Sequence, residues 1–350
     1  MKIRLVLYSL DRSYMEHLVN YLSIHHGDTL EINIFNETQA LEDYLKDYRT
    51  DIILLDQELS CKAEKGERLI RLSEERGSDP EDPVIFKYQR GELIYKAILN
   101  AFASGTDRIL HYSNRDGEME VGIDLFLPLN GGAGASTVAK AYAVKLASNR
   151  KVLYLNLELF GDCEKTLKAD GQFSFDDILY AVKNRRGNLT LKMESALKKS
   201  REGVFFYAPS ENPVNLMDFT EQEFHQLVDE IRKSGMFDCV VLDMDGFPSP
   251  WMQGALKDAD RIWLVADGTA ASSEKYDRFR KYIVALEKRT QSRFFPKMRI
   301  FYNKYSRRTG SPVNGCDLPV VGGSPRYEYV ETDAIIRNMA ESDAFEKERV

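Results

Sequence analysis

Residues 130–137 read NGGAGAST and have the composition of a loop that could bind phosphate. Its glycines permit positive φ and a close approach of the backbone to a ligand. Consecutive N–H groups of such a loop can point inward and hold phosphate oxygens. A helix beginning at the loop would add the partial positive charge of its N-terminus, and Ser136 could ligate Mg²⁺. We therefore expect nucleotide phosphates to bind at Asn130, Gly131, Gly132, Ala133, Gly134, Ala135, Ser136 and Thr137.

The loop differs from the full Walker pattern G-x-x-x-x-G-K-[ST] at two positions. Leu129 stands at the first glycine, and Ala135 stands at the lysine that contacts the β- and γ-phosphates. Lys140 lies one turn beyond Ser136 on the predicted helix and should not replace that lysine. An ordinary glycine-rich turn between a strand and a helix is the alternative. We favour phosphate binding because the preceding strand, the glycine spacing and the Ser136-Thr137 pair agree.

Two polar residues further along the chain follow apolar segments that read as buried strands. Asp243 comes directly after Val240–Leu242, at the strand end where open α/β sheets bind ligands. It could hold a water bound to Mg²⁺, or it could cap a helix. Asn303 follows Ile300–Tyr302 and could pair with an adenine edge through its amide. The alternative for Asn303 is a turn.

Short apolar runs alternate with amphipathic segments, which predicts parallel strands joined by helices. In the first third we expect strands at Ile3–Tyr8, Leu30–Phe35, Ile52–Leu55 and Pro83–Phe86, and helices at Tyr14–Ile24, Thr38–Tyr48, Arg68–Glu75 and Glu92–Ala103. Beyond the polar segment HYSNRDGE we expect strands at Ile123–Leu129, Val152–Leu157, Val204–Tyr207, Cys239–Leu242, Ile262–Val265 and Ile300–Tyr302, and helices at Ser136–Leu146, Gln222–Ser234 and Ser273–Glu287. The sequence therefore predicts two α/β domains, residues 1–108 and 119–350, with a linker at 109–118.

Composition narrows the class of protein. The 350 residues are 43% hydrophobic, and a net charge of −7 gives no reason to expect nucleic acid or an anionic membrane as a partner. The four cysteines are scattered, which argues against a disulfide framework or a zinc site and favours the cytoplasm. The start MKIRLVLYSL reads as a strand rather than a signal peptide. No apolar run approaches the roughly 18 residues of a membrane-spanning helix.

The motifs together resemble the ParA/MinD superfamily of deviant-Walker P-loop ATPases, whose loop reads K-G-G-x-G-K-[ST]-[ST]. The ending GAST is similar to the TadZ/CpaE branch, which is associated with pilus assembly. NLELFGD (156–162) resembles that branch's D-L-D-x-x-[FG]-G-D, and FDCVVLDMDG (237–246) resembles the family's Walker B strand. IFYNKY (300–305) resembles its adenine motif, and GGSPR (322–326) resembles the segment that closes over the adenine. The resemblance covers nearly the whole second domain.

This resemblance implies a P-loop NTPase domain with a mostly parallel sheet, binding ATP and Mg²⁺. The positions that it assigns are Glu158 and Asp243 for catalysis, Ser136 and, through a water, Asp243 for the metal, and Asn303, Pro325 and Arg326 for the base. Asn130 replaces the signature lysine, which in the family reaches the partner's nucleotide across a face-to-face dimer. Asn156 and Glu158 replace two aspartates. Because phosphoryl transfer depends on positioning and charge neutralisation, we expect binding with slow or absent hydrolysis.

Residues 1–108 resemble a response-regulator receiver domain with a flavodoxin-like fold, so we expect two three-layer α/β/α domains. Asp56 ends the third predicted strand, at the phosphoacceptor position. Asp11 follows the first strand, where an acidic pair normally holds Mg²⁺, but its neighbour is Leu10. VIFKYQ (84–89), which we take as the fourth strand, offers no Ser or Thr switch residue, and we find no fifth strand with the usual lysine. The TadZ/CpaE branch often has such an atypical receiver domain. We interpret it as a docking module, and a phosphosite at Asp56 is the alternative.

The leading hypothesis for function is an ATP-binding scaffold that forms a homodimer. The resemblance implies that it helps place Tad/Flp-type pilus or secretion machinery at a cell pole or at the inner face of the membrane, through partners of the receiver-like domain. The alternative is an active partitioning-type ATPase that binds DNA non-specifically. Its candidate basic stretch is Arg278, Arg280, Lys281, Lys288, Arg289, Arg293, Lys297 and Arg299. We favour a solvated helix face for this stretch. A membrane switch is disfavoured because the acidic C-terminus makes a poor interfacial helix.

Overall fold

The computed structural model describes residues 2–56, 68–75, 84–105, 121–184, 188–246, 249–306, 308 and 310–348. The chain divides into two compact units. The first unit is Met1–Tyr112 with Asn184–Ala196, and the second unit is Ser113–Lys183 with Leu197–Val350. The linker predicted at 109–118 lies outside the described residues.

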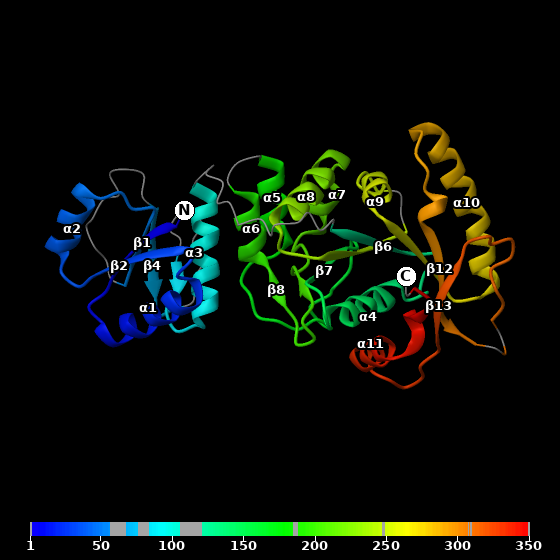
Figure 1. Cartoon of the computed structure of the whole chain (residues 1–350), viewed down its shortest axis with the longest axis horizontal. Helices are drawn as coiled ribbons and strands as arrows, with labels where there is room; N and C mark the ends of the chain where they lie inside the picture. Colours follow the sequence, from blue (N-terminus) through cyan, green and yellow to red (C-terminus); the bar gives the residue numbers. More distant parts are fainter. Residues whose placement is uncertain are drawn as a thin grey trace. The chain divides into compact units, whose positions relative to one another are not determined.

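A five-stranded parallel sheet in the order β2-β1-β3-β4-β5 forms the centre of the first unit. Its strands are β1 (Ile3–Tyr8), β2 (Leu30–Phe35), β3 (Ile52–Leu55), β4 (Arg68–Ser73) and β5 (Val84–Phe86). Alternation along β1 sends Val6 and Tyr8 to one face, where they cluster with Leu41 of α2 (Thr38–Asp47). Helices α1 (Arg12–His26) and α3 (Gly91–Gly105) contact each other on the other face (Figure 1). The unit therefore has three layers.

The helix predicted at Arg68–Glu75 is wrong, because this segment is the strand β4. Leu69 and Leu72 are three positions apart, which is also compatible with a helix. The buried residues, however, are Ile70 and Leu72, which follow the period of two of a strand. Consequently Val84–Phe86 is the fifth strand of this sheet and not the fourth.

Helix α6 (Leu189–Ala196) belongs to the first unit although it follows β7 in the chain. It packs against α3 (Figure 1). The Tyr95 hydroxyl donates to Glu194 Oε1 at 3.3 Å, and the Asn188 N–H donates to the Ala103 carbonyl at 3.3 Å. Because Leu191 of α6 is fully buried, a segment from the later part of the chain completes the core of this unit.

Glu194 is expected to make the stability of the first unit depend on pH. Burial raises the pKa of Glu194 from 4.5 to about 7, and no described residue bonds to its buried Oε2 atom. Between pH 4.5 and about pH 7, Glu194 of the folded chain holds a proton that Glu194 of the unfolded chain has lost. The free energy of unfolding therefore falls as pH rises through this range. Glu194→Gln should therefore stabilise the unit by about 2 kcal/mol at pH 8 and by little at pH 5.

Urea unfolding at both pH values, with hydrogen exchange of α3 and α6 to identify the unit that opens, measures this effect. Glu92→Gln is the matched control, because a hydrogen bond from His26 lowers the pKa of Glu92. That control should lose stability at neutral pH instead of gaining it. An unchanged slope of stability with pH in Glu194→Gln would contradict the assignment to Glu194.

The second unit contains an eight-stranded sheet in the order β13-β12-β11-β6-β10-β7-β9-β8, parallel except for the β8–β9 pair. Its strands are β6 (Gly122–Pro128), β7 (Val152–Leu157), β8 (Lys198–Lys199), β9 (Phe205–Phe206), β10 (Cys239–Met244), β11 (Arg261–Ala266), β12 (Met298–Tyr305) and β13 (Val320–Pro325). All six strands predicted for this domain are confirmed in position, and β8 and β13 were not predicted.

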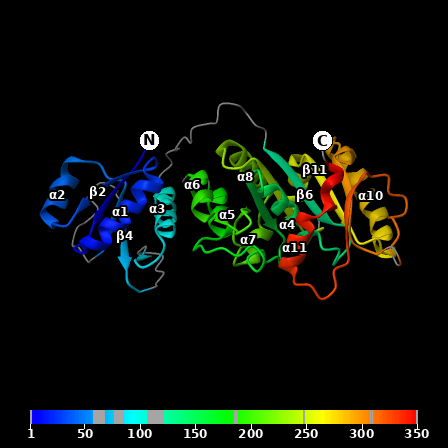
Figure 2. The same ribbon diagram turned by 60° about the horizontal axis from the view of Figure 1, so that its bottom comes forward.

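Helices cover both faces of this sheet. They are α4 (Ala135–Ala147), α5 (Phe175–Asn184), α7 (Pro213–Met217), α8 (Glu221–Ser234), α9 (Met252–Asp258), α10 (Ala270–Thr290) and α11 (Thr332–Glu341), with 3₁₀ turns at Phe295–Lys297 and Asp343–Glu348. Helices α4 and α11 contact each other on one face, and α8 and α9 contact each other on the opposite face (Figures 1 and 2). The predicted fold class, α/β with mostly parallel sheets, is confirmed.

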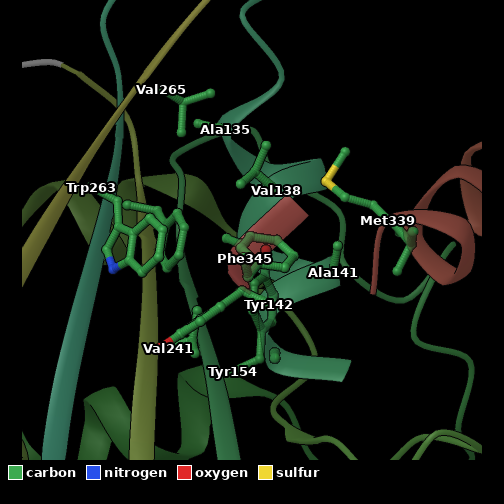
Figure 3. Packing of buried hydrophobic residues seen from close by; sticks show 14 of the residues in the cluster. Ala135, Val138, Ala141, Tyr142, Tyr154, Val241, Trp263, Val265, Met339 and Phe345 are labelled. Atoms are coloured by element: carbon green, nitrogen blue, oxygen red, sulfur yellow. The ribbon is translucent and has the colours of Figure 1, made fainter. Parts of the chain in front are cut away.

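The core beneath α4 joins aromatic residues of the sheet to Tyr142 and several small residues of the helix. Phe126 and Trp263 stack with ring centroids 5.0 Å apart, and the Trp263 indole donates to buried Asp124 at 2.9 Å. Val138 and Ala135 of α4 belong to the same cluster (Figure 3). The start of α4 is therefore anchored on the sheet next to the glycine-rich loop.

Candidate functional site: a glycine-rich loop over an acidic pair

The loop and the acidic residues meet at the carboxyl edge of the central strands. Strand β6 lies between β11 and β10, and β7 lies on the other side of β10. The register pairs Asp243 of β10 with Phe126 of β6 and with Asn156 of β7. Because parallel strands end at one edge, the loop after β6 and the ends of β7 and β10 share a site.

The loop has the backbone that the sequence predicts. Gly132 and Gly134 have φ of 75° and 82°, in the region that favours glycine. Helix α4 begins directly after Gly134, with no side-chain cap, so the first N–H groups of the helix remain available for an anion. A Cβ on Gly134 would lie 2.5 Å from Asn303 Nδ2, so this position also needs glycine for the close approach of β12.

Ser136, Glu158 and Asp243 come together beneath the loop. Ser136 Oγ lies 2.8 Å from Glu158 Oε1 and 3.3 Å from Asp243 Oδ1, and its single proton serves one of them at a time. Tyr154 of β7 donates to Asp243 Oδ2 at 2.5 Å. We call Glu158 and Asp243 the acidic pair.

The acidic pair suits a cation. Asp243 is fully buried, and burial together with the nearby Glu158 raises the pKa of Asp243 to about 7. Burial also raises the pKa of Glu158. Two carboxylates beside one hydroxyl repel each other, and a hard cation with oxygen ligands would relieve that repulsion. Across the described ranges no cluster of three or more His, Cys, Asp or Glu forms a metal centre of its own, so phosphate or water oxygens would complete the shell.

Asn130, at the signature position, is held inside its own unit. It is 6% exposed, and its Nδ2 donates to Asp267 Oδ2 at 3.0 Å. Ser272 lies within hydrogen-bond distance of both Asn130 Oδ1 and Asp267 Oδ1, at 2.7 Å in each case. Although burial opposes it, hydrogen bonds from Ser272, Thr269 and Asn130 lower the pKa of Asp267 to about 2. The network therefore fixes the start of the loop to β11 and α10.

Asn130→Ala is expected to lower the free energy of unfolding of the second unit by about 1.5 kcal/mol, because it removes the amide that accepts from buried Ser272 and donates to partly buried Asp267. Urea unfolding measures the change. Asn149→Ala, an exposed asparagine in the same unit, is the control and should stay within about 0.5 kcal/mol of the parent. Equal stability of both variants would show that the network does not hold the loop.

The residues predicted for the base lie beside the loop. Asn303 is buried, and its Nδ2 donates to the Ala133 carbonyl at 2.8 Å. Pro325 pairs with Tyr305 at the end of β13, and Arg326 follows it as an exposed residue. The contact of these side chains with a base stays a prediction, and one N–H of the Asn303 amide is bonded to the loop.

The segment after β7 is held near the acidic pair. Glu158 N–H donates to Asn156 Oδ1 at 3.1 Å, and Leu159 N–H donates to Asp245 Oδ2 at 2.8 Å. A Cβ on Gly161 would lie 2.6 Å from Asn156 Nδ2, so glycine is needed here. Asn156 thus shapes the turn that aims Glu158.

A second cluster of polar residues lies at the carboxyl edge of the first sheet. Lys87, directly after β5, donates to Asp56 Oδ2 at 2.9 Å, and its side chain is 4% exposed. Ser9 donates to the same Asp56 oxygen at 2.5 Å. Asp11 Oδ2 lies 3.5 Å from Lys87 Nζ. The bond to Asp56 raises the pKa of Lys87 although burial opposes it.

Two predictions for this cluster are wrong. The unit has a fifth strand, and Lys87 follows it at the place of the receiver lysine. The fourth strand is β4, which does end in a serine, Ser73, and the carbonyl of Ser73 accepts from the Lys87 N–H at 2.7 Å. Both errors come from the misassigned β4. The remaining difference from the usual receiver pattern is Leu10, which stands beside Asp11 where a second acidic residue is normal.

Tyr154, Asp267 and Ser272 were not predicted as site residues. Asp267 follows the apolar strand IWLVA, the same signal that selected Asp243, and could have been found in this way. Tyr154 lies within a strand, and Ser272 within the first turn of α10, and neither position carries a sequence signal of its own.

The second unit has the fold of the ParA-type P-loop ATPases. It is similar to a ParA family ATPase from Chlorobium tepidum TLS, with a TM-score of 0.53 and 15% identity, over 65% of this chain and 96% of that one. Cobyrinic acid a,c-diamide synthase from Mycobacterium smegmatis with bound ATP analog and magnesium is also similar, with a TM-score of 0.48 and 16% identity, over 63% of this chain and 93% of that one. The MinC:MinD complex of Aquifex aeolicus has a TM-score of 0.48 and 17% identity, over 63% of this chain and 86% of that one. The fold assignment rests on the first of these.

Residues 1–103 match the family described as TadZ-like, receiver domain. The chain therefore carries a TadZ-like receiver domain at residues 1–103, and its second unit has the fold of a ParA family ATPase, the two domain types that the sequence predicts. No curated protein matches the chain by sequence. Among the helices of the described ranges, none has the length and apolar character needed to cross a membrane.

Proposed function

We propose that the second unit binds ATP with Mg²⁺ and hydrolyses it slowly or not at all. The observation that carries the proposal is the Ser136 hydroxyl facing both carboxylates of the acidic pair, under a glycine-rich loop at the start of α4. Loop and helix N–H groups would hold the phosphates. Ser136 and, through a water, Asp243 would hold Mg²⁺, which when bound supplies positive charge to the phosphate oxygens.

Hydrolysis needs fixed positive charge at the loop, and positions 130 and 135 supply none. In the transition state charge spreads over the transferred phosphoryl group, and fixed cations normally neutralise it. Ala135 is an apolar residue packed in the core cluster. Asn130 is neutral, and its amide is bonded to Asp267. Glu158 and Asp243 remain as candidate catalytic carboxylates that could orient water.

Titration calorimetry with ATP and Mg²⁺ tests binding, and steady-state phosphate release tests turnover. We expect binding that weakens in Ser136→Ala and a rate far below the roughly 10 s⁻¹ of a typical enzyme. A rate near that value, abolished by Ser136→Ala, would contradict slow hydrolysis. A complete lack of heat on ATP addition would contradict nucleotide binding itself.

We further propose that the chain acts as a homodimeric localisation scaffold for Tad/Flp-type pilus or secretion machinery. The support is the pairing of a TadZ-like receiver domain with a ParA-type fold. The receiver domain would dock partner proteins and so recruit them to a cell pole or to the inner face of the membrane. Sedimentation with and without ATP, followed by imaging of a tagged chain and of its Asp56 and Ser136 variants, tests dimerisation and localisation.

DNA binding by the basic stretch is the less favoured function. Lys297 Nζ donates to the carbonyls of Lys257 and Ala259 at 2.9 and 2.7 Å, and Lys281 pairs with Asp277 at 2.6 Å. Part of this charge is therefore used within the protein. Salt-dependent binding of DNA in the presence of ATP would support the alternative.

A further inference from the structure

Strand β12 is irregular near its carboxyl end. Tyr302 pairs with Gly323 of β13. The next pair is Tyr305 with Pro325, so two residues of β12 stand opposite one residue of β13. This is a β-bulge, and Lys304 occupies it with φ of 55°, in the left-handed region. Residues other than glycine rarely adopt such φ values, and those that do concentrate at functional sites.

The bulge brings two consecutive side chains onto the glycine-rich loop. In a regular strand Asn303 and Lys304 would point to opposite faces of the sheet. Here Asn303 Nδ2 donates to the Ala133 carbonyl at 2.8 Å, and Lys304 Nζ donates to the Gly132 carbonyl at 2.7 Å. Lys304 Cε lies 3.5 Å from the place of a Cβ on Gly134. The lysine therefore lies across the loop.

The position matters because the loop itself carries no basic side chain. Residues 130–137 are uncharged, and their N–H groups offer only partial positive charge to a triphosphate. Lys140 of α4 is buried, with Nζ 5.8 Å from the ring centroid of Tyr154. Lys304, in contrast, is exposed and has three N–H donors, of which the Gly132 carbonyl uses one.

We propose that Lys304 binds the phosphate groups of the nucleotide and supplies the positive charge that positions 130 and 135 lack. This inference rests on the proposed ATP binding. A charged N–H group within reach of the loop can donate to phosphate oxygens, and such charge-assisted hydrogen bonds are the strong ones. The bulge explains the unusual φ, because this backbone directs the consecutive side chains of Asn303 and Lys304 onto one loop.

Calorimetric titration of ATP and AMP into the full chain tests the role of the charge. Lys304→Met should weaken ATP binding about tenfold, and AMP binding by less than about twofold, because AMP lacks the β- and γ-phosphates. Lys304→Gly should give the same loss for ATP with an unchanged thermal midpoint, since glycine adopts this φ readily. Lys145→Met is the matched control: Lys145 also donates to a backbone carbonyl, that of Ser342, at 3.0 Å, at the far end of α4.

The outcomes separate this inference from the proposed function. Tenfold losses for ATP in both Lys304 variants, with Lys145→Met unchanged, support a phosphate-binding lysine. ATP affinities of the Lys304 variants within about twofold of the parent would overturn the inference while leaving ATP binding intact. Equal losses for ATP and AMP would also overturn it, because they would show a role in loop shape or base binding. Failure of the unaltered chain to bind ATP would overturn both.

Discussion

Gly134→Ala is expected to weaken ATP binding about 100-fold, which corresponds to about 2.7 kcal/mol. Two physical costs add up to this loss. A left-handed φ of 82° costs alanine about 1–2 kcal/mol relative to glycine. The new Cβ would also lie 2.5 Å from Asn303 Nδ2 and would displace the amide that bonds to the Ala133 carbonyl, which costs about another 1 kcal/mol. The loop would then leave the conformation in which its N–H groups converge.

Gly235→Ala is the control for backbone strain alone. Gly235 has φ of 62° at the end of α8, and a Cβ there meets no atom within 4 Å. We expect it to lose stability by about 1 kcal/mol, as any alanine at positive φ does, and to bind ATP like the parent. Calorimetry and urea unfolding of both variants measure the two effects. If Gly134→Ala bound ATP normally, or if both variants lost affinity equally, the loop would not be the phosphate site.

The parts of the fold that were predictable are those in which local pattern and tertiary environment agree. The strands predicted for the second unit are mostly apolar runs, interrupted only at Asp124 and Asn156, as expected for strands buried between two helical layers. The order of strand, glycine-rich loop and helix was predictable for the same reason. Glycine spacing encodes the backbone directly, because only glycine tolerates the φ of Gly132 and Gly134.

The parts that were missed depend on contacts that sequence spacing does not encode. Segment Arg68–Ser73 satisfies both helical and strand periods, and only its pairing with β3 and β5 decides between them. Because this segment was predicted as a helix, the place of Lys87 directly after a fifth strand was missed. Helix α6 packs on α3 from far along the chain, since the hydrogen bond between Tyr95 and Glu194 spans 99 positions. No local sequence pattern predicts a packing partner that is so distant in the chain.

The Asp56–Lys87 pair leads to the second large effect that we expect. Asp56→Ala should lower the free energy of unfolding of the first unit by about 3 kcal/mol, because removing one partner of a buried ion pair leaves the other charge uncompensated. Lys87 is 4% exposed, and the neighbouring carboxylate of Asp11, 3.5 Å away, is half-exposed and compensates only in part. Urea unfolding of the full chain, followed at α1 and α3 by hydrogen exchange, measures the loss.

The double variant Asp56→Ala/Lys87→Met tests the cause, since it removes both charges. It should recover at least half of the lost stability. If the double variant is less stable than Asp56→Ala alone, the pair does not explain the loss.

The same geometry bears on phosphorylation of Asp56. Asp56 Oδ2 already accepts hydrogen bonds from Ser9 and Lys87, and its side chain is only 8% exposed. Leu10 stands where a second acid would help to hold Mg²⁺. Transfer of a phosphoryl group to this largely buried carboxylate would have to occur without the full metal site, so we expect acetyl phosphate with Mg²⁺ to leave the intact mass unchanged. A mass increase of one phosphoryl group that is absent in Asp56→Asn would show instead that Asp56 is a phosphosite. The ion pair with Lys87 would then be the unphosphorylated state of this site.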